Sequence, residues 1–77
     1  MDIRNTEERP EVLEIYRWSV VQAELGLAEQ LSNWDTDSTW HNSLFRELAT
    51  GRQWVVYLAD QAWPGEVRLV ITSPAAT

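Results

Sequence analysis

Hydrophobic positions in the first half of the chain recur with the spacing of a helix. Pro10 and its acidic neighbours suit a first helical turn, since proline is tolerated there and carboxylates favour the positive end of the helix dipole. Apolar residues then recur every three or four positions to about Leu31. This spacing predicts a helix from about Pro10 to Leu31. Its expected core stripe is Leu13, Tyr16, Val20, Ala23, Leu27 and Leu31.

The same helix carries a second apolar set on roughly its opposite side. If one face packs on the rest of the domain, the other needs a further layer from this chain or from another chain. Gly26 is expected to weaken the helix slightly. The second set consists of Ile15, Trp18, Val21 and Leu25.

A second helix is predicted after the turn-forming segment SNWDTDS, residues 32–38. Asp35, Thr36 or Asp37 would cap a helix running from about Ser38 to Thr50. Gly51 would end it in a left-handed conformation. The broad apolar face expected to pair antiparallel with the first helix consists of Trp40, His41, Leu44, Phe45 and Leu48.

From Arg52 onward the pattern is typical of two strands, RQWVVYLAD and EVRLVITS. Pro64 and Gly65 fit the central positions of a type II turn, so a hairpin is predicted. An isolated hairpin is marginally stable in water. It would rest on the helices, pair with residues 2–4, or join a hairpin from another subunit. In the first strand, Trp54, Val56 and Leu58 face one side and Val55 and Tyr57 the other.

These elements predict one small α+β domain over residues 1–77, with two antiparallel helices followed by a C-terminal β-hairpin. Dimerisation would be one way to complete a larger sheet. A winged-helix-like fold is the alternative, because helices followed by a hairpin resemble the end of that fold. Its usual DNA-binding function is not expected, since no basic recognition helix is present.

Size, charge and cysteine content narrow the function. A chain of 77 residues without cysteine has a small core and neither a disulfide nor a thiolate metal site, which makes self-association a natural supplement and a homodimer an open option. The net charge of -6 argues against direct nucleic-acid binding and permits a basic protein partner. No secretory or membrane-spanning segment is recognised, because the longest apolar run, residues 54–59, is short. A cytoplasmic location is therefore expected.

Candidate chemistry is sparse, and the sequence predicts no enzyme, no metal site and no cofactor. His41 could be paired with Asp35 or Asp37 and a serine, yet no oxyanion-hole glycine motif accompanies it, and a half-buried core or interface role is preferred. Asp35 and Asp37 could begin a calcium loop, but Trp40 and Arg46 occupy the positions that need glycine and glutamate. The three glycines are isolated, so no phosphate-binding loop is present.

Two features remain as candidates for binding. The first is the acidic character of residues 1–34, which hold seven acidic and three basic side chains. The second is the presence of five tryptophans, a residue type that is enriched at interaction hot spots. The predicted function is a small acidic inhibitor or adaptor that docks on a basic protein, such as a nucleic-acid-binding protein. A phage-encoded inhibitor of a bacterial defence complex and an antitoxin or immunity protein are examples of this class. The alternative is a self-assembling structural or accessory subunit. The candidate partner-binding residues are Glu11, Glu14, Trp18, Leu25, Trp34, Asp35, Asp37 and Trp63.

Overall fold

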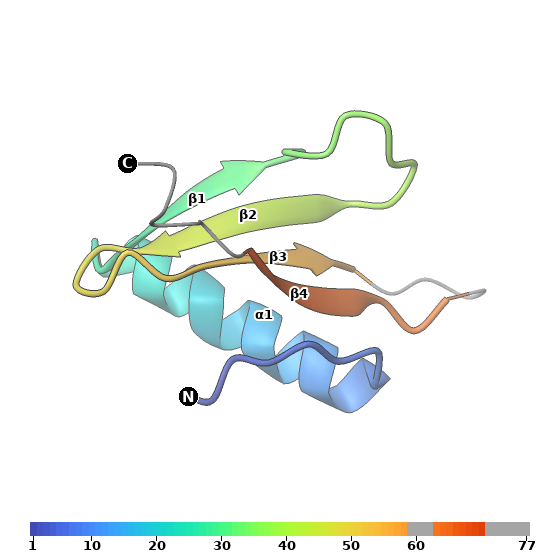
Figure 1. Ribbon diagram of the computed structural model, residues 1–77, viewed down its shortest axis with the longest axis horizontal. Helices are drawn as coiled ribbons and strands as arrows, with labels where there is room; N and C mark the ends of the chain where they lie inside the picture. Colours follow the sequence, from blue (N-terminus) through green and yellow to red (C-terminus); the bar gives the residue numbers. More distant parts are fainter. Residues whose placement is uncertain (59–62, 71–77) are drawn as a thin grey trace, which may run out of the picture.

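One helix packs against one face of a four-stranded antiparallel sheet in the computed structural model, which describes residues 1–58 and 63–70 (Figure 1). The strands lie in the order β1-β2-β3-β4, so neighbours in the sequence are neighbours in the sheet. The protein is therefore a small α+β domain. The elements are α1 (Arg9–Glu24), β1 (Ala28–Ser32), β2 (Asn42–Glu47), β3 (Gln53–Tyr57) and β4 (Glu66–Val70).

The prediction of two helices followed by a hairpin is wrong, and so is the winged-helix alternative. The central part of the predicted second helix forms β2, which pairs with β1 on one side and β3 on the other. Phe45 lies opposite Trp54 and is fully buried. Alternating burial along this strand, with Ser43 and Phe45 inside and Arg46 exposed, overrode the apolar spacing that favoured a helix.

Gly51 adopts the predicted left-handed conformation, with φ of +75°, but it closes the turn between β2 and β3 rather than a helix. Its N–H donates to the carbonyl of Glu47 (2.8 Å), and the N–H of Glu47 donates to the carbonyl of Arg52 (2.8 Å). Gly51 therefore has the predicted backbone conformation, but it lies in a turn between two strands and not at the end of a helix.

Helix α1 ends at Glu24, seven residues before the predicted end at Leu31. Gly26 has a φ of +76°, the N–H of Leu27 donates to the carbonyl of Gln22 (2.9 Å), and the N–H of Gly26 donates to that of Ala23 (3.1 Å). This pair of bonds is the Schellman motif, in which a left-handed glycine stops the helix. The chain then leaves the helix and begins β1.

The face of α1 that enters the core lies between the two apolar sets of the sequence pattern. Val12, Ile15 and Ser19 are buried, whereas Leu13, Leu27 and Leu31 of the expected stripe are exposed. Tyr16 and Val20 from that stripe, and Trp18 from the other set, pack at the margins of the core. The buried core cluster consists of Ile3, Val12, Ile15, Phe45, Trp54, Val56 and Val67.

The two C-terminal strands pair with each other as predicted, but as the last two strands of the four-stranded sheet and not as a separate hairpin. β3 and β4 pair antiparallel, with Trp54 and Val56 in the core and Leu58 packed against it, as the alternation predicts. Gly65 has a φ of +90°, which suits its predicted turn position. The rest of the connection, residues 59–62, lies outside the described residues.

The hairpin is supported within one chain, so no second subunit is needed to complete this sheet. β2 extends it on one side. On the other side Thr6 exchanges two backbone hydrogen bonds with Val67 (3.1 and 2.8 Å), and the N–H of Leu69 donates to Asn5 Oδ1 (2.7 Å). Pairing with the N-terminal segment therefore occurs, at Thr6 rather than at the predicted residues 2–4.

Candidate protein-binding site

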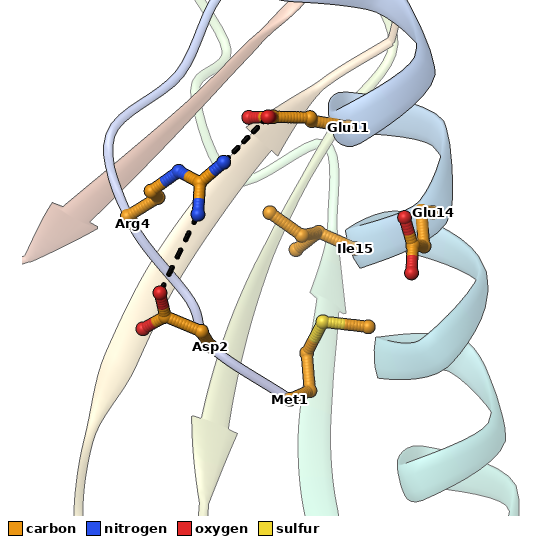
Figure 2. Close-up of a pocket in the computed structure, with 6 residues that line it drawn as sticks. All are labelled: Met1, Asp2, Arg4, Glu11, Glu14 and Ile15. Atoms are coloured by element: carbon orange, nitrogen blue, oxygen red, sulfur yellow. Dashed lines mark hydrogen bonds and ion pairs between the residues drawn. The ribbon is translucent and has the colours of Figure 1, made fainter.

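A cleft lies between the N-terminal segment and α1, and three of its side chains are carboxylates (Figure 2). Its volume is about 220 Å³. The N-terminal segment forms one wall and the first turns of α1 form the other. The lining residues are Met1, Asp2, Arg4, Glu11, Glu14 and Ile15.

Packing of the N-terminal segment positions this cleft. Ile3 is buried in the core cluster, and the bridge between Thr6 and Val67 ties the segment to β4. On the other wall, Ile15 enters the core and turns the helix so that Glu11 and Glu14 flank the cleft. The acidic side chains are therefore placed by apolar contacts of their neighbours.

One arginine serves two of the three carboxylates. Arg4 Nη2 donates to Glu11 Oε1 (2.5 Å), and Arg4 Nη1 lies 3.4 Å from Asp2 Oδ2 (Figure 2). The hydroxyl of Thr6 donates to Glu11 Oε2 (2.9 Å). The hydrogen bond with Glu11 and its negative charge raise the pKa of the Arg4 guanidinium above its ordinary value. Glu11 is thus held in place by its partners.

Glu14 differs from its neighbours because it has no salt bridge or hydrogen bond to another side chain within the described ranges 1–58 and 63–70. It is exposed on α1 and lines the cleft. Asp2 and Glu11 contact the Arg4 guanidinium, whereas Glu14 lies beyond Ile15 on α1 (Figure 2). The side chains that line the cleft include three carboxylates and one guanidinium, so their net charge is negative. The structure therefore brings together two of the predicted binding residues, Glu11 and Glu14, at a site suited to a cation.

The apolar residues among the candidates for partner binding do not line this cleft. Trp18 is half-buried, and its ring packs against Trp54 with the centroids 6.1 Å apart, so it forms part of the core margin. Leu25 is the C-cap residue of α1 and is 66% exposed. Trp34 follows β1 and is 44% exposed. Leu25 and Trp34 are accessible to a partner, whereas much of Trp18 is committed to packing.

Asp35 caps a turn rather than the predicted helix. Its Oδ1 accepts the N–H of Asp37 (3.1 Å), and its own N–H donates to Asn42 Oδ1 (2.8 Å). Asn42 also donates to the carbonyls of Asp35 (3.1 Å) and Trp40 (3.0 Å), so this buried amide organises the loop between β1 and β2. Asp35 is therefore a capping residue, as the sequence predicts, but it caps a turn in a loop and not a helix. Asp37 itself is exposed.

A hydrogen bond links this loop to β3. The hydroxyl of Tyr57 donates to Asp35 Oδ2 (2.9 Å). Burial of the ring, followed by this hydrogen bond and the negative charge of Asp35, raises the pKa of Tyr57 above its ordinary value of 10.0. The carboxylate of Asp35 is thus occupied by structural contacts.

Trp63 belongs to an aromatic group at the same end of the sheet. Its ring centroid lies 5.1 Å from that of Trp40 and 5.9 Å from that of Tyr57. Trp63 is half-buried, and its carbonyl accepts a long hydrogen bond from Arg9 (3.5 Å). Trp40, expected in the core on a second helix, instead closes the loop against Trp63.

His41 is exposed and directly precedes β2, so its expected half-buried place on an apolar helix face is wrong. Ser43 is buried and accepts a hydrogen bond from Gln30, while Ser38 accepts one from the N–H of Trp40. Over residues 1–58 and 63–70, no three histidine or acidic side chains are grouped closely enough to hold a metal ion.

Sequence reasoning missed Asp2 and Arg4 as parts of the cleft. Arg4 and Glu11 are seven residues apart, and an irregular segment intervenes between them. No periodicity relates such positions, so only the return of the N-terminal segment over α1 brings them together. The one available signal was the concentration of acidic residues near Pro10.

Comparisons with protein families, curated proteins and solved structures find no match to this chain. Among the described residues no helix is long and apolar enough to cross a membrane.

Proposed function

We propose that this protein is a binding module, an inhibitor or adaptor, that docks the cleft between its N-terminal segment and α1 on a basic surface of another protein. The observation that carries the proposal is the state of Glu14, which lines the cleft and has no cationic partner among residues 1–58 and 63–70, while Asp2 and Glu11 share Arg4. A carboxylate in this position is available for a charge-assisted hydrogen bond from an incoming arginine or lysine.

The charge around the cleft supports this proposal. Residues 1–14 contain five acidic side chains and two arginines, a net charge of −3 and half of the chain's total of -6. A concentrated field of one sign increases the rate at which an oppositely charged partner associates. Acidic residues here also favour the positive end of α1, so the same side chains serve folding and recognition.

The dimensions of the cleft suit one side chain rather than a large ligand. A volume of about 220 Å³ is below the usual range of small-molecule pockets, which begins at roughly 300 Å³. An inserted arginine or lysine would contact Glu14, while Arg4 continues to hold Glu11 and Asp2. The cleft would then select the partner's basic residue by its position as well as by its charge.

We accordingly propose that the protein acts by binding its partner and catalyses no reaction. His41 is exposed, and the hydroxyl oxygens of Ser38 and Ser43 accept hydrogen bonds from Trp40 and Gln30. An inhibitor of a nucleic-acid-binding complex, of the kind that phages direct against bacterial defence systems, would use acidic surface in this way. An antitoxin or immunity protein that blocks a basic toxin would use it similarly.

The proposal is tested by comparing three tagged baits in lysate of the source organism or its host: the wild-type chain, Glu14→Lys, and the control Glu24→Lys. Glu24 is an exposed glutamate of the same helix that does not line the cleft. A basic protein captured in stoichiometric amount by the wild type and by Glu24→Lys, released by moderate salt and lost with Glu14→Lys, supports the proposal. Equal capture by all three baits, or absence of a basic partner, contradicts it.

A further inference from the structure

The outer edge of β1 presents backbone groups that do not pair with β2. The N–H of Asn33 donates to the carbonyl of Asn42 (2.7 Å), and the N–H of Leu48 donates to the carbonyl of Leu27 (3.1 Å). In an antiparallel ladder hydrogen-bonded positions alternate, so odd-numbered residues of this strand face β2. The N–H and C=O groups of Ala28, Gln30 and Ser32 therefore point away from the sheet.

The two edge strands of the sheet differ in whether another segment covers them. β4 is covered by the N-terminal segment, through the backbone bridge at Thr6 and the side chain of Asn5. Within residues 1–58 and 63–70, no backbone group bonds to the outer side of β1. β1 contains neither proline nor lysine, which commonly protect edge strands from pairing.

Large apolar side chains are exposed at the start, middle and end of this edge. Leu27 is 54%, Leu31 56% and Trp34 44% exposed. The β-sheet register places Leu31 beside Leu44, and Leu44 beside Val55, on the face away from α1. Leu31 and Leu44 also line a hollow of about 280 Å³. The edge therefore combines strand hydrogen-bonding groups with an apolar row.

We propose that two copies of this chain pair through β1, antiparallel about a two-fold axis near Leu31, to form one continuous eight-stranded sheet. Leu31 of each copy then lies opposite Leu31 of the other, and the row of Leu31, Leu44 and Val55 continues across the axis. The two-fold also brings the end of β1 near Trp34 in one copy beside the start near Leu27 in the other.

The exposed apolar side chains at the start, centre and end of this edge would cover one another in a two-fold pairing, which favours a second copy over an unrelated peptide. The charges agree with the pairing. Glu29, the acidic residue of β1, is bonded to Arg46 of its own chain through Arg46 Nε (2.8 Å), so the strands meet without an uncompensated carboxylate. The acidic cleft is built from the N-terminal segment and α1, elements that this interface does not use.

The proposed dimer differs from the hairpin pairing expected from the sequence, because β3 is an interior strand and β4 is bridged by Thr6. It also stands independently of the proposed function. Loss of self-association in a β1 variant and loss of a basic partner in Glu14→Lys are separate measurements on separate surfaces.

Analytical ultracentrifugation of the full chain over a range of concentrations tests the proposal, with Gln30→Pro as the main variant. Proline removes the outward N–H of Gln30, which β2 does not use, and its fixed φ is tolerated on an edge strand. Two hydrogen bonds disappear per dimer, and the dissociation constant should rise by about tenfold or more. Gln30→Ala is the matched control, since it also loses the side-chain bond to Ser43 but keeps the N–H.

A second pair of variants keeps the test decisive if Gln30→Pro unfolds. Leu31→Lys should abolish the dimer, because it places like charges together at the axis. Leu25→Lys, at a leucine at the end of α1 that is more exposed than Leu31, should leave the dimer unchanged. Amide exchange at Ala28, Gln30 and Ser32 should slow as concentration rises. A chain that stays monomeric, or a dimer unaffected by Gln30→Pro and Leu31→Lys, overturns the proposal.

Discussion

The indole Nε1 of Trp54 donates to Ser19 Oγ at 2.9 Å, and Ser19 in turn donates to the carbonyl of Ile15 at 2.6 Å. Both side chains are completely buried. This pair of bonds joins the centre of α1 to the centre of the sheet and satisfies the polar atom of the largest core residue. The serine on the inner face of the helix is therefore a partner for the tryptophan rather than a defect in the apolar stripe.

Ser19→Ala should lower the free energy of unfolding by about 1–2 kcal/mol, because the indole N–H of Trp54 would be left buried without an acceptor. Urea denaturation gives the value. In a chain that already carries Trp54→Phe, which has no N–H to satisfy, the same replacement should cost less. Equal costs in the two backgrounds would show that the bond adds nothing to stability.

Val12→Ala and Val21→Ala compare the same change on the inner and outer sides of α1. Val12 is 1% exposed and Val21 is 47% exposed. The first change should cost about 2 kcal/mol through lost burial and the cavity left behind. The second should change stability by less than about 0.5 kcal/mol. Thermal unfolding of the two variants measures the difference, and similar costs would mean that the helix face is assigned wrongly.

Gly26→Ala distinguishes the observed helix end from a helix that continues to Leu31. At a φ of +76° an alanine is strained, so the change should destabilise the chain by about 1 kcal/mol, although a Cβ there would meet nothing within 4 Å. Inside a longer helix the same change would stabilise by a similar amount. Gly26→Asn, which tolerates the left-handed region better, should cost less than alanine. Chemical denaturation reads the sign directly.

Tyr57 should ionise above pH 10 in the folded protein, because burial and its bond to Asp35 favour the neutral phenol. The folded state then holds the proton more tightly than the unfolded state does. Its contribution to stability is complete below the unfolded pKa of about 10 and is lost as pH rises through the folded pKa. Spectrophotometric titration of Tyr16→Phe, which leaves Tyr57 as the only tyrosine, measures this pKa.

Asp35→Asn in the Tyr16→Phe background should move the pKa of Tyr57 back toward 10, because the negative charge that opposes phenolate formation is removed. Asp37→Asn, a neighbouring exposed aspartate without a bond to Tyr57, is the control and should leave the titration unchanged. A pKa that does not respond to Asp35→Asn would mean that burial alone produces the shift.

Local sequence determined the hairpin, the start of α1 and the backbone conformation of two glycines. β3 is rich in β-branched and aromatic residues whose alternation matches the two faces of a sheet, and Pro10 lies in the first turn of the helix. Gly51 and Gly65 adopt positive φ values, as the patterns around them predict. These features depend on neighbours within a few positions, which is the range over which periodicity and steric preference act.

Only the tertiary structure decided that residues 42–47 form a strand and that α1 buries the side containing Val12 and Ser19. The segment NSLFRE has apolar spacing compatible with a helix, but pairing with β1 and β3 and the stack of Phe45 on Trp54 stabilise it as a strand. The acidic cleft and the exposed edge of β1 likewise arise from contacts between distant segments. These contacts cannot be predicted from a short stretch of sequence, because they stabilise the protein only when the sheet and the helix are packed together.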